Sequence, residues 1–221
     1  MKLTVLGPGC WGLTLAWLMN DNFEDIVIWG RECDLNDDLV INKHCSKPLE
    51  VQLDKKVQIT SDLKKAIEGA DIILSVVATG GVRPVCEQLK AAGIKPETPL
   101  VNASKGLELN TLMRMSEVIK DVLPEQKVVI LSGPTLAKEV LMGKPTAASE
   151  DIETAEFVQK ACNVPNRFRL YTNTDVIGVE LGGSLKNVIA IASGFAHTMD
   201  LGDNCMGSLL TRGMAEIVRL S

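Results

Sequence analysis

The sequence predicts an α/β fold in which a doubly wound parallel sheet is followed by the start of an all-α second domain. Three observations point to this fold. Short apolar runs alternate with helix-like stretches, a glycine-rich loop follows the first run, and only helical patterns follow residue 175. Continuous apolar strands between helices are typical of a parallel sheet that is covered on both faces. The 221 residues are enough for one large domain, or for one domain and part of another.

Strands are expected where short runs rich in Val, Ile and Leu end at glycine or polar residues. They are expected at residues 3–6, 26–29, 57–60, 72–77, 100–103, 128–131, 146–149 and 168–172. Helices are expected between them, at residues 13–19, 63–68, 82–91, 112–122 and 154–162. The polar stretch 32–56 has no clear period. It is expected to contain a helix or an excursion at the sheet edge, because structureless connections of this length are uncommon.

The pattern changes near residue 175. Two apolar, periodic stretches follow, at residues 176–199 and 209–220, and neither has the features of a strand. We therefore predict a first domain at residues 1–175. Residues 176–221 are expected to be the first helices of a truncated second domain, because two or three helices are too few for a core of their own.

The composition excludes several classes of protein. A formal net charge of −5 argues against general binding to nucleic acid or to anionic membranes. No two of the six cysteines are closer than Cys33 and Cys45, and there are only two histidines, so no metal site is expected. Reduced thiols predict a cytoplasmic location. No charged leader is expected at the N-terminus, and no stretch is expected to reach the ~18 apolar residues of a membrane span.

The glycine-rich loop is the first functional motif. Gly7, Gly9 and Gly12 fit the pattern GxGxxG directly after a strand and at the start of a helix. In this context the first glycine permits a tight turn, the second lets a pyrophosphate approach the backbone, and the third lets helix and strand pack closely. The first domain is therefore predicted to be a Rossmann-like, dinucleotide-binding domain. The alternative is a glycine turn with no ligand.

The end of the second strand bears on which dinucleotide is bound. An NAD-selective site has Asp or Glu here, to hold the ribose hydroxyls. This chain has Trp29 and Gly30, followed by Arg31. A guanidinium can pair with a 2′-phosphate, so NADP is favoured over NAD, although NAD stays open. The alternative is that Arg31 is a solvated loop charge.

Two further strand ends carry polar chemistry. Lys105 follows the strand at 100–103, and Gly133, Pro134 and Thr135 follow the strand at 128–131. Ligands of open parallel sheets bind beyond the carboxyl ends of the strands, which is where the glycine loop also lies. A proline in a first helical turn, with free N–H groups behind it, predicts a helix start that can receive a substrate oxygen or phosphate. The alternative for Lys105 is an ordinary surface lysine.

The first helix of the second domain contains an unusual lysine. Gly182 and Gly183 each cost ~1 kcal/mol relative to alanine, so a close approach is expected there. Lys186 lies one turn after Gly182, and a long apolar stretch follows it. Burial would lower the pKa of such a lysine and suit it to proton transfer. The alternative is a structural ion pair between Lys186 and Glu180.

Several blocks together resemble a known family. They are GPGCWG at 7–12, WGR at 29–31, SKGLE at 104–108, SGPTLAKE at 132–139, ELGGSLKNVIAIASG at 180–194, and GDN at 202–204 followed by LTRG at 210–213. These blocks are similar to those of the bacterial NAD(P)-dependent glycerol-3-phosphate dehydrogenases, over essentially the whole chain. The resemblance implies reversible reduction of dihydroxyacetone phosphate to sn-glycerol 3-phosphate with NAD(P)H, which supplies glycerophospholipid synthesis. It also implies that residues 176–221 begin a substrate-binding helical domain.

The resemblance also assigns roles to single residues. Cofactor-binding positions of the family match the glycine loop together with Cys10, Trp11, Arg31 and Ala137. Lys105 matches a position that touches both cofactor and substrate. Gly133 and Thr135 match substrate-binding positions. Lys186 matches the catalytic acid/base, which also touches the substrate.

Departures from the family leave alternatives open. The chain reads HCSKPL at 44–49 and has Ala78 and Thr79 where the family has other residues, and it ends before helices that complete the family's substrate site. A catalytically incomplete NAD(P)-binding fragment is therefore one alternative. A related 3-hydroxyacid or ketopantoate-type dehydrogenase is the other. The expected partner is a small phosphorylated substrate, and the question of a homodimer stays open.

Overall fold

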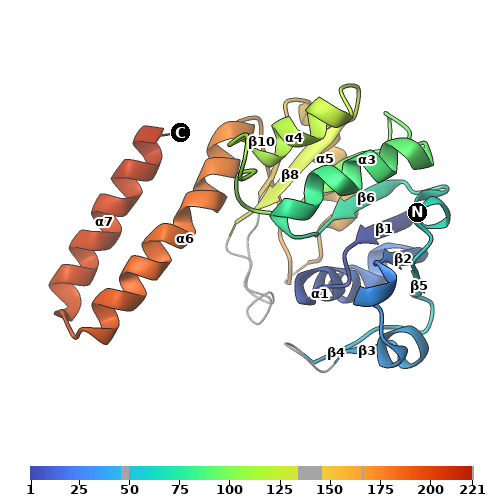
Figure 1. Cartoon of the computed structure of the whole chain (residues 1–221), viewed down its shortest axis with the longest axis horizontal. Coiled ribbons are helices and arrows are strands. Elements are labelled where there is room, and N and C mark those ends of the chain that lie inside the picture. Colours follow the sequence, from blue (N-terminus) through green and yellow to red (C-terminus); the bar gives the residue numbers. More distant parts are fainter. Residues whose placement is uncertain (46–49, 134–145, 166, 221) are drawn as a thin grey trace.

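The computed structural model describes residues 1–45, 50–133, 146–165 and 167–220 (Figure 1). Its centre is an eight-stranded sheet in the order β10-β9-β8-β7-β6-β1-β2-β5. The strands are β1 (Lys2–Leu6), β2 (Asp25–Trp29), β5 (Gln58–Thr60), β6 (Ile72–Ser75), β7 (Leu100–Asn102), β8 (Val128–Ser132), β9 (Thr146–Ala148) and β10 (Tyr171–Asn173). The chain adds β2 and β5 on one side of β1 and then returns to add β6, β7 and β8 on the other. This confirms the doubly wound fold and places its switch point between β1 and β6.

The sheet is parallel from β5 to β8 but not beyond. β9 pairs with β8 in the antiparallel direction, and β10 is parallel to β9. The expectation of a parallel sheet therefore needs correction at this edge, where reversed strands are common in otherwise parallel sheets. The strand expected at 168–172 also lies later, because Phe168 is fully buried in the core and its backbone bridges to Val164.

Helices cover both faces of the sheet (Figure 1). They are α1 (Cys10–Leu18), α2 (Leu63–Ile67), α3 (Val82–Ala92), α4 (Met115–Val122) and α5 (Ile152–Cys162). Side chains of β1 alternate between two cores, because successive residues of a strand point to opposite faces. Leu3 and Val5 join the core that includes α1 and α5, and Leu6 joins the core under α3 and α4. α4 begins later than expected, since Leu112 is exposed with a left-handed φ of 59°.

The polar stretch 32–56 makes the expected excursion at the sheet edge. It contains a 3₁₀ turn at Glu32–Asp34, a π-helical turn at Asp38–Asn42, and the two short antiparallel strands β3 (His44–Cys45) and β4 (Val51–Gln52). Leu39 is buried and joins the core on the α1 side of the sheet. The excursion is therefore packed against the core of the domain.

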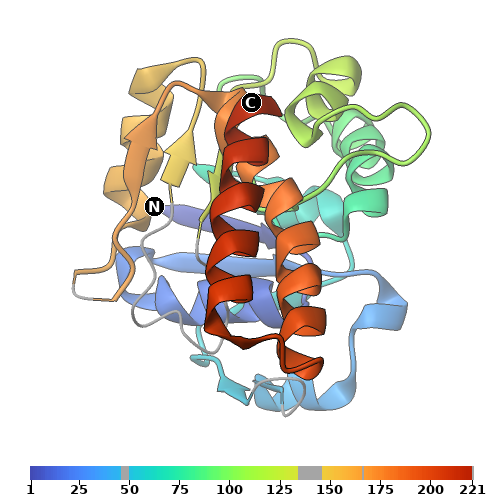
Figure 2. The same ribbon diagram turned by 90° about the vertical axis from the view of Figure 1, so that its left-hand side faces the viewer.

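The last part of the described chain is a helical hairpin. α6 (Val176–Thr198) and α7 (Gly202–Leu220) lie side by side and extend away from the sheet (Figures 1 and 2). The expected buried helix beyond Lys186 is not observed, since Val188, Ile191 and Phe195 are each more than 60% exposed. The domain boundary at 175/176 stays a prediction.

By length and composition alone, α6 is also long and apolar enough to cross a membrane. This corrects the expectation that no stretch approaches that limit. A single helix of this kind is weak support for a membrane span, because apolar helices of other proteins meet the same criterion.

Two glycines of α7 should respond in opposite ways to alanine. No described atom lies within 4 Å of a Cβ at Gly207, whereas a Cβ at Gly213 would lie 2.6 Å from Cδ1 of Ile189 in α6. We expect Gly207→Ala to raise the free energy of unfolding by about 0.5–1 kcal/mol through helix propensity. Gly213→Ala should lower it, by about 1–3 kcal/mol, because the Ile189 side chain must shift and the contact between α6 and α7 is overpacked. Urea unfolding followed by circular dichroism measures both, and equal effects would contradict the packing.

Candidate active site

The three glycines of the glycine loop have two different roles. Gly7 has a φ of +111°, and a Cβ there would lie 2.8 Å from the carbonyl oxygen of Val76 at the end of β6. A Cβ at Gly12 would overlap the carbonyl oxygen of Gly7. Both glycines are thus required by the chain's own packing. Gly9 is different, because no described atom lies within 4 Å of its Cβ position. That open space suits the approach of a ligand to the backbone.

The start of α1 faces the same space. Gly9 is its N-cap and makes no side-chain capping bond, so first-turn N–H groups of α1 stay available near Cys10. The helix dipole adds positive potential at this point. Trp11 is partly buried, with its ring centroid 6.4 Å from that of Phe168. An open cradle, available donors and a positive helix end together fit the pyrophosphate of a dinucleotide.

Arg31 lies just beyond β2, at the predicted cofactor edge. Gly30 before it packs against Pro8 of the glycine loop, where a Cβ would lie 2.7 Å from Cγ of Pro8. The Arg31 guanidinium makes two hydrogen bonds to Asp34, of 2.7 and 2.8 Å, and these bonds lower the pKa of Asp34. The Arg31 side chain is nevertheless 69% exposed. A phosphate could therefore reach it, in competition with Asp34.

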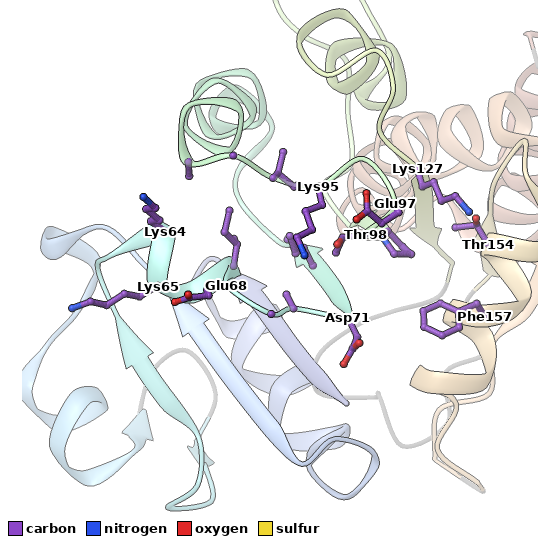
Figure 3. A pocket seen from close by; sticks show the side chains of 18 of the residues that line it. Lys64, Lys65, Glu68, Asp71, Lys95, Glu97, Thr98, Lys127, Thr154 and Phe157 are labelled. Carbon is purple, nitrogen blue, oxygen red and sulfur yellow. The ribbon is translucent and has the colours of Figure 1, made fainter.

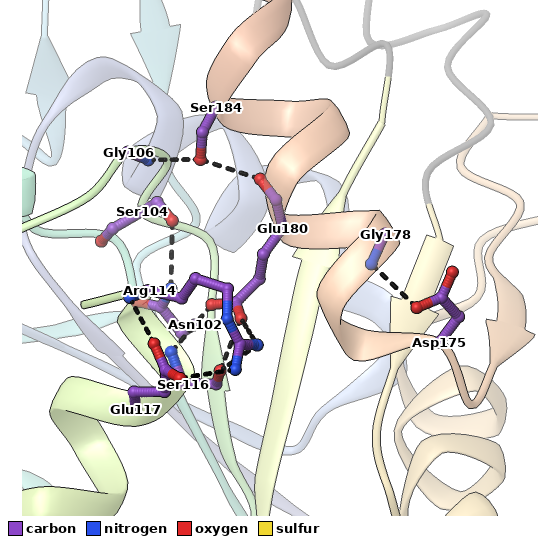
Figure 4. Close-up of polar contacts among 10 residues, drawn as sticks. All are labelled: Asn102, Ser104, Gly106, Arg114, Ser116, Glu117, Asp175, Gly178, Glu180 and Ser184. Carbon is purple, nitrogen blue, oxygen red and sulfur yellow. Dashed lines mark hydrogen bonds and ion pairs between the residues drawn. The ribbon is translucent and has the colours of Figure 1, made fainter. Parts of the chain in front are cut away.

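Four of the polar contacts between described residues hold the loop that carries Lys105. Ser104 Oγ donates to the Val77 carbonyl at 2.6 Å, and Thr79 Oγ1 donates to the Lys105 carbonyl at 2.8 Å. Asn102 Nδ2 donates to the Ser104 carbonyl at 3.0 Å. The fourth contact comes from α6, where Ser184 Oγ accepts a hydrogen bond of 3.0 Å from the Gly106 N–H (Figure 4). The loop is therefore fixed both to the sheet and to α6.

Lys105 points toward the end of β8, where its Nζ donates to the Gly133 carbonyl at 3.1 Å. Burial is the main cause that lowers the pKa of Lys105 to about 8, and the positive charge of Lys186 adds to it. The two lysines expected from separate strand and helix motifs thus interact electrostatically. The burial that was expected for Lys186 is not observed, since Lys186 is exposed, whereas Lys105 is partly buried.

A buried carboxylate fixes the base of α6 (Figure 4). Glu180 accepts a hydrogen bond from Arg114 Nη1 at 2.9 Å and one from the Ser116 N–H at 2.8 Å, and Ser116 Oγ donates as well. Arg114 also donates to Glu117 at 2.8 Å. The suggested ion pair between Glu180 and Lys186 is therefore wrong. Sequence reasoning missed Arg114 and Ser116, because nothing in their spacing links the start of α4 to a residue in α6.

Close approach explains one of the two adjacent glycines of α6, Gly182 and Gly183. A Cβ at Gly183 would overlap Ser132 Oγ at the end of β8 and would lie 3.9 Å from Cδ of Lys105. No described atom lies within 4 Å of a Cβ at Gly182, so its expected close approach is not observed among the described residues. Only about 10 Å³ of cavity remains between the Lys105 loop, β8 and the base of α6.

The third predicted strand end is described only at its start. Gly133 follows β8 with a φ of +139°, a conformation that favours glycine. Pro134, Thr135 and Ala137 lie outside the described residues, and so does the helix start expected there.

A larger hollow lies at the opposite edge of the sheet (Figure 3). This groove of about 1080 Å³ is lined by residues that precede β6, β7 and β8, among them Asp71, Pro99 and Lys127. Its charges are mixed, with lysines and carboxylates side by side. Ligands of open α/β sheets bind at the carboxyl ends of the strands, so we assign the site to the edge that carries the glycine loop.

Comparison with known proteins identifies the family of this chain. The family model for the NAD-dependent glycerol-3-phosphate dehydrogenase N-terminus matches residues 2–158, and the model for the C-terminus matches residues 175–221. The chain belongs to this family. The model for the N-terminus covers the glycine loop, the Lys105 loop and Arg114, and the model for the C-terminus covers α6.

Relatives share most of this chain but are longer. The glycerol-3-phosphate dehydrogenase [NAD(P)+] of Bacillus pumilus is 44% identical over 99% of this chain and 65% of its own length. That of a Thermoanaerobacter species is 44% identical over 100% of this chain and 67% of its own length. The crystal structure of glycerol-3-phosphate dehydrogenase from Coxiella burnetii is 30% identical, with a TM-score of 0.88, and matches 99% of this chain and 68% of that one. This chain thus spans about two thirds of the length of these relatives.

The electrostatic link between the two lysines can be measured directly. We expect Lys105 to titrate with a pKa of about 8, so its cationic fraction falls as the pH rises through 8. Lys186→Ala should raise this pKa toward the ordinary value of 10.5 without reaching it, because burial, the larger cause, remains. Lysine-selective ¹³C NMR against pH provides the measurement, and Lys105→Ala assigns the resonance. An unchanged pKa in Lys186→Ala would show that the two side chains do not interact.

Proposed function

We propose that this chain takes part in the reversible reduction of dihydroxyacetone phosphate to sn-glycerol 3-phosphate with NAD(P)H. The observation that carries the proposal is the electrostatic interaction between Lys105 and Lys186. Both belong to the sheet edge that also carries the glycine loop. Two interacting cations at the carboxyl edge of the sheet suit a substrate with a phosphate and a carbonyl oxygen. Family membership supports the same reaction.

Each lysine has a distinct proposed role. A bound reduced nicotinamide supplies the hydride that reduces the carbonyl carbon. Lys105, held by its loop and partly buried, polarises the carbonyl and orients the substrate. Lys186 donates a proton to the carbonyl oxygen and, in the reverse direction, accepts the proton of the hydroxyl group. The exposure of Lys186 leaves it able to exchange that proton with solvent.

The other predicted residues complete the proposed binding site. The glycine loop binds the cofactor near its phosphates, through Gly7, Gly9, Cys10, Trp11 and Gly12. Arg31 and Ala137 are further cofactor contacts, and Lys105 touches cofactor and substrate. Gly133 and Thr135 bind the substrate, together with both lysines.

The wider role is proposed on the same grounds. NADP is favoured over NAD because Arg31, rather than an acidic residue, follows β2. The product would supply glycerophospholipid synthesis, in the cytoplasm. Whether the chain forms a homodimer stays open.

A second candidate function is dinucleotide binding without turnover. It is favoured by the exposure of Lys186 and of the apolar side chains that follow it in α6, since a catalytic proton donor usually lies in a site that excludes water. Calorimetry with NADPH and an NADPH-oxidation assay on the same sample separate the two functions. A panel of carbonyl substrates that includes 3-oxoacids and ketopantoate tests the related dehydrogenase classes in the same assay.

The proposed proton donor is tested by Lys186→Ala. We expect this variant to lose NADPH oxidation with dihydroxyacetone phosphate by at least ~100-fold, because general acid catalysis contributes that much or more. Its affinity for NADPH should stay close to that of the unchanged chain, since Lys186 lies in α6, away from the glycine loop. The control is Lys64→Ala, which removes a lysine at the opposite sheet edge. Turnover near that of the unchanged chain would contradict the assignment.

The proposed cofactor preference is tested by Arg31→Gln. A charge-assisted hydrogen bond to a 2′-phosphate contributes about 1.5–3 kcal/mol, so the Kd for NADPH should rise by about 10- to 100-fold. The Kd for NADH should change little. Asp34→Asn is the matched variant, since it weakens the competing ion pair and should strengthen NADPH binding. Equal losses for both cofactors in Arg31→Gln would place Arg31 outside the 2′-phosphate site.

A further inference from the structure

Ser184 connects the two segments that carry the proposed lysines. Its Oγ accepts the hydrogen bond from the Gly106 N–H and donates one of 2.8 Å to the Glu180 carbonyl in the preceding turn of α6. Lys105 is the residue before Gly106, and Lys186 lies two residues after Ser184. A hydrogen-bonded connection between the two segments therefore passes through this hydroxyl group, and its bond to the Gly106 N–H is drawn in Figure 4.

The contacts around Ser184 make it a rigid connection. Its second hydrogen bond, along the helix, fixes the orientation of the hydroxyl group. Residues 180, 183 and 184 share one face of α6, because residues three and four apart lie one above the other on a helix. On this face Glu180 binds α4, Gly183 packs against the end of β8 and near the Lys105 side chain, and Ser184 makes the hydrogen bond to the backbone of the Lys105 loop.

We propose that Ser184 is a positioning residue that sets the spacing between Lys105 and Lys186 by fixing the Lys105 loop to α6. The proposal deepens the function proposed above and rests on it for the chemical role of the two lysines. Like charges repel, so the lysines separate when this connection is removed. The charged groups on the other side of Ser184, Glu180 and Arg114, neutralise each other and do not replace the connection.

The first test measures the spacing between Lys105 and Lys186 and needs no activity assay. The pKa of Lys105, followed by lysine-selective ¹³C NMR, should rise in Ser184→Ala, because the charge of Lys186 moves away. Ser184→Thr keeps the hydroxyl group and should restore most of the original value. Asp175→Ala removes the N-cap bond of α6 to the Gly178 N–H and so controls for a weakened helix, with no expected effect on Lys105. An unchanged or lower pKa in Ser184→Ala would overturn the proposal.

A double-mutant cycle separates spacing from burial. In a Lys186→Ala background, Ser184→Ala should have little further effect on the pKa of Lys105. An equal rise in both backgrounds would show that Ser184 acts only on the burial of Lys105, and would overturn the proposal.

The second test measures turnover. Ser184→Ala should lower kcat by about tenfold with a smaller change in KM, since misplacing a catalytic group by ~1 Å can cost ~100-fold. Ser184→Thr should recover most of that loss. Unchanged kcat in an active enzyme would overturn the proposal. If the unchanged chain does not oxidise NADPH with dihydroxyacetone phosphate, the proposed function fails, and the NMR cycle still decides the role of Ser184.

Discussion

The position of α6 depends on one buried carboxylate. Glu180 is only 7% exposed, and an ion removed from water costs several kcal/mol unless partners replace the lost hydration. Arg114 and the two donors of Ser116 provide that replacement. A buried ion pair adds little net stability compared with an apolar contact, but loss of one partner costs about 3–5 kcal/mol. We infer that this pair determines where α6 packs more than how strongly the fold is held.

The glycines act together with that ion pair. A charged anchor specifies a partner, but it does not bring two backbones close, and Gly183 does so by leaving room for Ser132 Oγ. The glycine loop shows the same difference between its glycines. Gly7 and Gly12 allow internal packing, and Gly9 leaves an open surface among the described residues. In both places, the glycines that allow close packing are different residues from the one that lies open to a ligand.

The sequence predicted the doubly wound sheet, the edge excursion and Lys105 as a cation at the carboxyl edge of the sheet, because each depends on local pattern and on the rule that strand ends meet at one edge. It did not predict the reversed strands β9 and β10, since the direction of a short edge strand is decided by a long connection and not by its own residues. It predicted burial for Lys186, which is exposed, because burial of a helix face depends on what packs against it. Contacts such as those of Arg114 with Glu180 join residues 66 positions apart, and no spacing rule reveals them.

The local charge of the site differs from that of the whole chain. The net charge of −5 describes the whole surface, yet the carboxyl edge of the sheet gathers the start of α1, Lys105 and Lys186. The carboxylate that α6 brings to this edge, Glu180, is already neutralised by Arg114. The local electrostatic potential attracts a phosphate where cations lie close together and nearby carboxylates are paired with other cations. The ion pair that anchors α6 therefore has two effects, since it positions Lys186 and removes the negative charge that would otherwise oppose an anionic substrate.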